Sequence, residues 1–304
     1  MRQNVLGRTG LQVSAIAYGG IVSTMSAYAN YTYSGDGQQA SDDYVAYALE
    51  AGINYFDVAP KYGDAQEKLG NSLRGVRECV TLACKTGWRD YDSAARDAEQ
   101  SLKLLHTDHF DIYQLHALGS VEDVENAFAP GGVMRLMEEL KKSGTARFLG
   151  ITAHSESAAL KALDLYDFDT VLFSTNWQMN MAIGYGNQII RKAKERSMGI
   201  LGMKSMIERD FGPEEEELRR RWPKSWCKPF DPETQPDLLL AAMKYARAME
   251  PDTLIPAGDF EHFRFAVEHA DEVWDAPLTD AEQRLLETHL PKVKDRLFMP
   301  QRDR

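Results

Sequence analysis

Three ionisable side chains in the first half of the chain each come directly after a short apolar segment. They are Asp57, Lys85 and His116, and a helical pattern separates each segment from the next. An ionised group at the end of an apolar strand must be solvated, paired or functional. In a barrel of parallel strands, all carboxyl ends face one side. We therefore expect these groups to lie together, with Tyr62 from the loop after Asp57 beside them.

Several segments of the chain resemble the aldo-keto reductases. Residues 4–14 are similar to the opening hairpin of that family, residues 56–63 to its main signature, and residues 113–116 to its fourth-strand motif. The second half resembles a less characterised bacterial subgroup, in residues 173–177, 202–206, 224–226 and 255–259. The resemblance implies a carbonyl reductase or alcohol dehydrogenase that uses a nicotinamide cofactor, with NADP(H) slightly favoured over NAD(H).

Within this family, the four polar groups take distinct roles. Reduction of a carbonyl by hydride requires a proton for the oxygen, where negative charge grows. A tyrosine hydroxyl has an ordinary pKa of about 10, so a neighbouring cation is needed to favour the phenolate. We expect Tyr62 to be the general acid and base, Lys85 to be that cation, and Asp57 to hold Lys85 in place. His116 would orient or polarise the carbonyl, as a neutral imidazole or an imidazolium.

The remaining sequence predicts one domain, residues 1–304, that alternates strands with helices. The fold class is α/β, a (β/α)8 TIM barrel with an N-terminal β-hairpin and extra C-terminal helices. Ser93 is a natural N-cap for a helix over 93–105, and Thr279 with Glu282 forms a capping box that opens a tail helix. The expected barrel strands are residues 14–18, 53–56, 79–84, 110–115, 147–151, 170–174, 199–202 and 252–255.

Composition narrows the class of protein. The chain has 304 residues and a net charge of −11, which disfavours a nucleic-acid partner. No run of eighteen apolar residues is present, so we expect no membrane span. Three cysteines, without a Cys-x-x-Cys pair, indicate a reducing cytoplasm and neither a disulfide framework nor a zinc site. No strand carries a His-x-His pair, so no metal is expected, and the oligomeric state stays open.

Cofactor contacts are expected at the exits of the first strand and of strands five to eight. Thr152 lies where the family binds the nicotinamide carboxamide, but Ala153 replaces the usual amide residue, which Asn176 could supply. Met203 stands where many members place a stacking aromatic ring, and Asp259 is near the expected adenosine end. The full set of expected cofactor residues is Gly20, Ile21, Thr152, Asn176, Met203, Lys204, Ser205, Pro256, Gly258, Asp259 and Arg264.

Aromatic residues on the loops after the strands are the expected walls of a substrate pocket. These residues are Tyr28, Trp88, Trp177 and Trp226. A large apolar pocket with a few hydroxyl partners suits a bulky carbonyl or a sugar-like substrate equally.

Two other classes of function remain open at this point. A regulatory protein could keep a bound nucleotide on the same fold without turnover. A lyase or isomerase could use Tyr62 and Lys85 without net hydride transfer, and the departures at Ala153 and Met203 give this alternative some weight.

Overall fold

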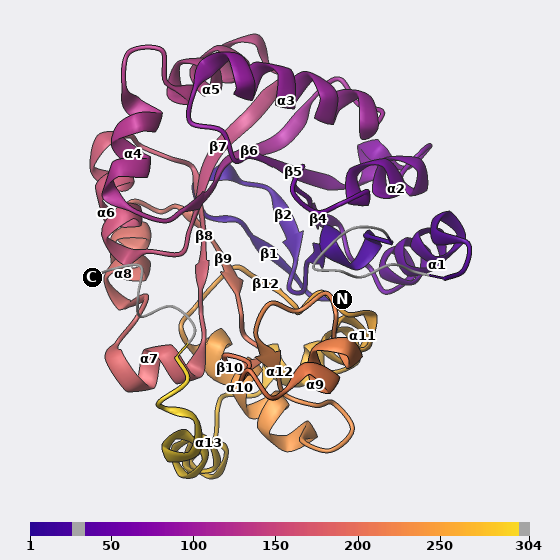
Figure 1. Ribbon diagram of the computed structural model, residues 1–304, viewed down its shortest axis with the longest axis vertical. Helices are drawn as coiled ribbons and strands as arrows, with labels where there is room; N and C mark the ends of the chain where they lie inside the picture. Colours follow the sequence, from indigo (N-terminus) through magenta and orange to yellow (C-terminus); the bar gives the residue numbers. More distant parts are fainter. Residues whose placement is uncertain (26–33, 298–304) are drawn as a thin grey trace.

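The computed structural model describes residues 1–25 and 34–297, which form a barrel of parallel strands surrounded by helices (Figure 1). Neighbouring strands of the main sheet follow the order β12-β9-β8-β7-β6-β5-β4-β3. The predicted (β/α)8 architecture is confirmed. The strands are β3 Tyr18–Gly19, β4 Tyr55–Asp57, β5 Thr81–Thr86, β6 Phe110–Leu118, β7 Ala146–Ala153, β8 Thr170–Ser174, β9 Gly199–Met203 and β12 Thr253–Ile255.

Backbone hydrogen bonds close the sheet between β12 and the segment before β3. Leu254 donates to the carbonyl of Ala15 at 3.0 Å and accepts from the amide of Ala17 at 2.9 Å. One end of the barrel is covered by the predicted hairpin, whose strands are β1 Gln3–Val5 and β2 Gln12–Ser14. Side chains from the hairpin and the strands fill the interior beneath the site: Leu6, Val13, Ala17, Tyr55, Ala83, Ile112, Leu172 and Leu201.

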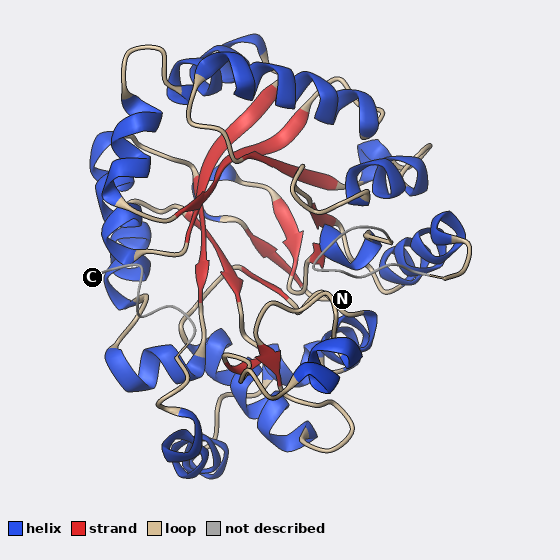
Figure 2. Ribbon diagram, viewed as in Figure 1, coloured by secondary structure: helices blue, strands red, loops and turns tan. Residues whose placement is uncertain are grey.

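Helices form the outer layer of the barrel (Figure 2). Most of them turn an apolar face inward, as in α5, where Val133, Leu136 and Met137 are buried. No described helix is both long and apolar enough to cross a membrane. The helices are α1 Gly37–Glu50, α2 Ala65–Ser72, α3 Tyr91–Leu104, α4 Val121–Phe128, α5 Val133–Ser143, α6 Glu156–Leu165, α7 Trp177–Ile183, α8 Asn187–Glu195, α9 Glu216–Arg221, α10 Pro236–Ala248, α11 Phe260–Glu268, α12 Ala270–Asp275 and α13 Asp280–Val293, with 3-10 turns at Gly7–Thr9, Gly20–Ser23 and Arg77–Cys79.

Helix caps show where local sequence signals succeed and where they fail. The capping box of Thr279 and Glu282 at α13 is confirmed. Ser93, however, does not cap α3, because the carboxylate of Asp90 accepts a hydrogen bond from the Ser93 amide and the helix begins earlier. The prediction was wrong because both residues are good caps and Asp90 comes first.

A short hairpin that the sequence did not predict follows β9. Its strands are β10 Ile207–Arg209 and β11 Lys228–Pro229, which pair antiparallel with a register shift. Strands of three and two residues carry too few residues to show an alternating pattern. The hairpin lies near the opening of the barrel and forms part of the wall of the site described below (Figure 1).

Candidate active site

A cavity of about 340 Å³ lies at the carboxyl ends of the barrel strands. This is the end of the barrel at which side chains from different loops converge. All four residues expected to carry the chemistry line it, as do seven of the expected cofactor and substrate contacts. The predicted residues at the cavity are Ile21, Asp57, Tyr62, Lys85, His116, Thr152, Met203, Lys204, Trp226, Pro256 and Gly258.

A buried ion pair between Lys85 and Asp57 forms the floor of the cavity. The Lys85 side chain is fully buried and its ammonium donates a hydrogen bond to Asp57 Oδ1. The same ammonium lies 3.3 Å from the Val58 carbonyl oxygen, and Gln114 donates to Asp57 Oδ2 at 3.1 Å. Both carboxylate oxygens therefore have donors, which is the condition under which a buried pair is tolerated.

Tyr62 lies beside this pair. Lys85 Nζ is 5.4 Å from the centroid of the Tyr62 ring, and the rings of Tyr62 and His116 are 5.8 Å apart in an edge-to-face arrangement. Burial first, and the negative charge of Asp57 next, raise the pKa of Tyr62 above its ordinary value. The sequence led us to expect the opposite direction. The difference arises mainly because burial disfavours the charged phenolate, and Asp57 in addition offsets the charge of Lys85.

His116 completes the cluster as a neutral imidazole. Burial first, and the positive charge of Lys85 next, hold its pKa well below the ordinary value, so the ring is uncharged at neutral pH. Its Nδ1 atom is buried and has no hydrogen-bond partner among the residues that the structure describes. The next residue, Ala117, has a φ of 55°, and its amide donates to Thr152 Oγ1 at 2.7 Å. Thr152 thus helps to fix the turn that presents His116.

The opposite side of the cavity is built by the loops after β9 and β12. Lys204 has a φ of 67°, and its ammonium lies 5.8 Å from the ring of Trp226. Asn176 donates from its amide nitrogen to the carbonyl oxygens of Lys204 at 3.0 Å and Ile207 at 2.8 Å. Non-glycine residues with positive φ are uncommon and gather at functional sites. Asn176 thus supports this loop, and the structure does not place it at the cavity.

Lys224 is a cavity residue to which the sequence analysis gave no role, although residues 224–226 carried part of the family resemblance. It is buried, and its ammonium donates to the Val22 carbonyl at 2.8 Å. Burial lowers the pKa of Lys224 to about 8. A Cβ atom at Gly258 would lie 2.8 Å from the Lys224 carbonyl oxygen, so the two loops approach as closely as glycine permits. Ser225 fastens this contact by donating to Asp259 at 3.0 Å.

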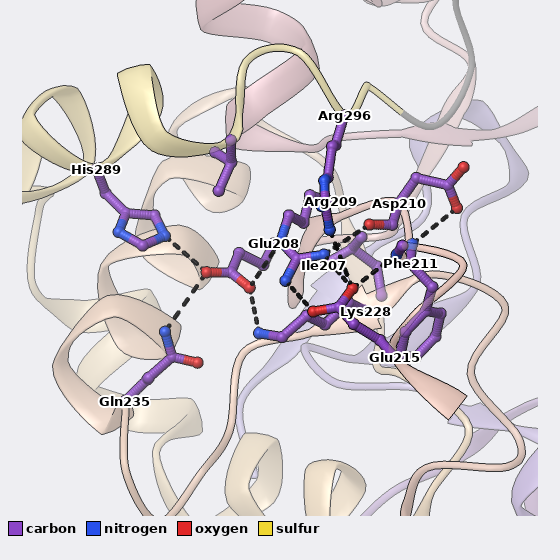
Figure 3. Close-up of polar contacts among 12 residues, drawn as sticks. Ile207, Glu208, Arg209, Asp210, Phe211, Glu215, Lys228, Gln235, His289 and Arg296 are labelled. Carbon is purple, nitrogen blue, oxygen red and sulfur yellow. Dashed lines mark hydrogen bonds and ion pairs between the residues drawn. The ribbon is translucent and has the colours of Figure 1, made fainter. Parts of the chain in front are cut away.

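A charged cluster lies behind the part of the cavity wall that β10 forms (Figure 3). Ile207 lines the cavity, and the next residue, Glu208, is buried and pairs with Lys228 of β11. His289 of α13 lies 2.7 Å from the other oxygen of Glu208, and Gln235 donates to that oxygen at 3.5 Å. Burial opposes the ionisation of Glu208, but His289 and Lys228 outweigh it and hold its pKa at about 2. The C-terminal helix is thereby tied to the cavity wall.

Several expected site residues lie elsewhere. Trp177 is fully buried and donates to the Ile207 carbonyl at 3.1 Å, so it is a core residue. Trp88 is half exposed in a shallow surface depression, and Arg264 lies on the exposed side of α11, 3.8 Å from Glu268. The remaining corrections are that Gly20, Ser205 and Asp259 do not line the cavity. Tyr28 lies outside the described residues.

Gly20, Asp259 and Ser205, which were expected to contact the cofactor, have other surroundings in the structure. A Cβ atom at Gly20 would lie 2.8 Å from the Asp57 carbonyl oxygen, so glycine is required by strand packing. Asp259 turns its carboxylate toward Ser225 and the Lys224 amide, and burial raises its pKa to about 6. The sequence had suggested that this charge would face the cofactor site. In the structure it does not face the cavity. Ser205 is buried beside the loop, with its hydroxyl unpaired among the described residues.

Comparisons with known proteins identify the family of the chain. The family model described as "Aldo/keto reductase family" matches residues 25–206. L-galactose dehydrogenase of Arabidopsis thaliana is 33% identical over 163 residues, which are 48% of this chain and 47% of that protein. Aldo-keto reductase YhdN of Bacillus subtilis is 30% identical over 171 residues, 51% of this chain and 48% of that protein. The chain belongs to the aldo/keto reductase family, and each alignment spans about half of the curated relative.

Solved structures support the fold. Aldo-keto reductase AKR11C1 of Bacillus halodurans, in its holo form, superposes with a TM-score of 0.67 at 19% identity, and all of both chains is covered. An aldo-keto reductase of Klebsiella pneumoniae in complex with NADPH gives a TM-score of 0.65 at 21% identity, covering 98% of this chain and 99% of that one. At these identities the likeness concerns the fold alone.

Proposed function

We propose that this protein is an NAD(P)(H)-dependent oxidoreductase that reduces a carbonyl group or oxidises the corresponding alcohol. The observation that carries the proposal is the meeting of Asp57, Tyr62, Lys85 and His116 at one cavity in a chain of this family. A protein that only binds a nucleotide has no need of a buried lysine and carboxylate beneath a tyrosine.

The residues opposite the catalytic group fit a dinucleotide. Lys204 and Lys224 provide two cations for phosphate groups, and Gly258 leaves the wall without a side chain at the point where two loops touch. Asp259 does not line the cavity, and its carboxylate is turned toward Ser225 and the Lys224 amide, which weakens its repulsion of a phosphate bound there. We therefore propose NADP(H), in preference to NAD(H), as the cofactor. When bound, the nicotinamide supplies or accepts the hydride.

Tyr62 is the proton donor in the direction of reduction. Its raised pKa keeps the hydroxyl protonated at neutral pH, and a carbonyl oxygen that gains negative charge takes this proton. The ammonium of Lys85, 5.4 Å from the ring centroid, stabilises the phenolate that remains. Neutral His116 orients the same oxygen, and the engaged carboxylate of Asp57 keeps Lys85 in position. In the oxidising direction Tyr62 accepts the proton.

Titration with NADPH and NADH, followed by a panel of carbonyl compounds, tests the proposal. The panel includes sugars, because two relatives are named L-galactose dehydrogenase and D-arabinose 1-dehydrogenase. We expect saturable quenching of tryptophan fluorescence with the tighter binding for NADPH, and loss of nicotinamide absorbance with at least one carbonyl. Binding without turnover of any compound would favour a regulatory role. Absence of binding would favour a lyase or isomerase that uses Tyr62 and Lys85.

A further inference from the structure

Most of the charged side chains that line the cavity are positive. Among the residues that the structure describes, four lysines, Lys61, Lys85, Lys204 and Lys224, line it together with one carboxylate, that of Asp57. Asp57 is engaged by Lys85, and Asp259 and Asp64 act on the charge of Lys224, so Lys61 and Lys204 are the cavity lysines that form no ion pair with a carboxylate among the described residues. The chain as a whole has a net charge of −11, so this excess of positive charge is local to the site. A concave site lined by one sign of charge concentrates ligands of the opposite sign.

The three lysines other than Lys85 lie on two different sides. Lys204 follows β9, and Lys224 packs against the loop after β12, where we place the phosphates of the dinucleotide. Lys61 follows β4 and directly precedes Tyr62, so it belongs to the side that carries the proton donor. The strand order separates β4 from β9 by four strands on one path around the barrel and by β3 and β12 on the other. A group bound by Lys61 is therefore close to the reacting carbonyl.

The end of the exposed Lys61 side chain lies against the loop after β5. A Cβ atom at Gly87 would lie 2.8 Å from Lys61 Cε and 3.1 Å from Lys61 Nζ, so glycine makes room for this side chain. Lys61 has no hydrogen bond or ion pair with any residue that the structure describes. The carboxylates whose titration it influences are Asp97 and Asp123, and Asp123 is paired with Arg89 at 3.3 Å.

We propose that the substrate is a carbonyl compound with an anionic group, a carboxylate or a phosphate, and that Lys61 binds this group. This inference rests on the proposed carbonyl chemistry and names the substrate class of the same site. Lys61 then fixes one end of the substrate while Tyr62 and His116 meet its carbonyl oxygen. Two fixed points orient a small substrate better than the carbonyl alone.

Matched pairs of substrates test the proposal. One pair is 4-formylbenzoate and 4-methylbenzaldehyde, which differ in the carboxylate, and the other is glyceraldehyde 3-phosphate and glyceraldehyde, which differ in the phosphate. We expect kcat/KM to favour the anionic member by about tenfold in at least one pair, mainly through KM, and the preference to shrink as salt is added. The pair with the larger preference distinguishes a carboxylate from a phosphate.

Variants at Lys61 assign the preference to this residue. Lys61→Met should remove the preference, mainly by raising the KM for the anionic member, whereas Lys61→Arg should keep it and Lys61→Glu should invert it. Lys292→Met is the matched control, because it removes the same charge from the exposed side of α13. An unchanged preference in Lys61→Met, or no preference in the unaltered protein, overturns the proposal while turnover of the neutral compounds still upholds the reductase.

If none of these compounds is turned over, the result counts against the proposed reductase activity. Equilibrium binding then still tests the role of Lys61. Benzoate and benzamide are titrated by calorimetry into the NADP⁺-saturated protein and into the protein alone. We expect benzoate to bind more tightly than benzamide, and Lys61→Met to remove the difference. Equal binding of the two, or a difference that survives in Lys61→Met, overturns the assignment of Lys61.

Discussion

The ammonium of Lys85 and the carboxylate of Asp57 form an ion pair that is almost completely buried beneath the cavity. Gln114 donates to the second carboxylate oxygen, so the pair is also fixed in orientation. Its position beside Tyr62 means that the same contact stabilises the barrel and places a positive charge near the residue that we propose as proton donor. Stability and activity should therefore both depend on it, but in ways that can be separated.

Removal of Lys85 should destabilise the protein strongly. In Lys85→Met the carboxylate of Asp57 stays buried without its cation, and we expect the free energy of unfolding in urea to fall by about 3–5 kcal/mol. The double variant Asp57→Asn/Lys85→Met removes both charges and should recover much of this loss, but not the turnover. Lys103→Met, which breaks an exposed pair with Glu99, should change the free energy by at most about 1 kcal/mol. Equal losses for both single variants would contradict the account.

The affinity for the dinucleotide should depend on pH through Lys224. Its ammonium is charged below a pKa of about 8, and a bound phosphate group favours the charged form. Affinity should thus be full below pH 8 and fall as pH rises through that value, by up to about tenfold for each pH unit. Fluorescence titration with NADPH between neutral and alkaline pH measures the effect.

Two variants separate this cause from general effects of alkaline pH. Lys224→Met should bind NADPH weakly with an affinity that no longer changes near pH 8. Lys224→Arg keeps its charge over the whole range and should bind with a flat profile at higher affinity. A profile in Lys224→Met that still falls near pH 8 would show that another group is responsible.

Glu208 should stabilise the hairpin of β10 and β11 in a pH-dependent way. The folded pKa of about 2 lies below the ordinary glutamate value of 4.5, so the stabilisation is complete above about pH 4.5 and is lost as pH falls toward 2. Glu208→Gln should lower the free energy of unfolding by about 3 kcal/mol at neutral pH, because Lys228 is left without its buried partner. The difference from the unaltered protein should shrink on acidification.

Glu216→Gln is the matched control for this prediction, since Glu216 pairs with Arg220 at the exposed surface. It should have little effect at any pH. A pH-independent loss in Glu208→Gln would indicate altered packing and not the loss of an ion pair. Because Ile207 lines the cavity, Glu208→Gln should also raise the KM for the substrate.

The sequence predicted the floor of the site better than its rim. Asp57, Lys85 and His116 lie in the carboxyl-terminal parts of strands whose apolar residues are plain in the sequence, and the barrel geometry then determines where these groups meet. Tertiary hydrogen bonds could not be inferred in the same way. Asn176 has the right chemistry for a nicotinamide ligand, yet its amide supports the Lys204 loop, and Trp177 beside it is part of the core.

Long-range contacts also decide the electrostatics. We expected Lys85 to lower the pKa of Tyr62. Burial and the negative charge of Asp57 raise it instead. Lys224 is distant in sequence from every proposed catalytic residue, and it reaches the cavity through long-range contacts with Val22, Gly258 and Asp259. The sequence shows a lysine directly before Tyr62. It does not show that the end of this side chain lies beside Gly87, in the loop after β5.

The most direct test of the account is turnover by Tyr62→Phe. The variant lacks only the hydroxyl, so NADPH should bind within about twofold of the unaltered affinity while kcat for the best carbonyl falls by at least about 10²-fold. Tyr91→Phe removes an exposed hydroxyl that donates to Glu139 and should keep full activity. Undiminished turnover by Tyr62→Phe would contradict the assignment of Tyr62 as the proton donor.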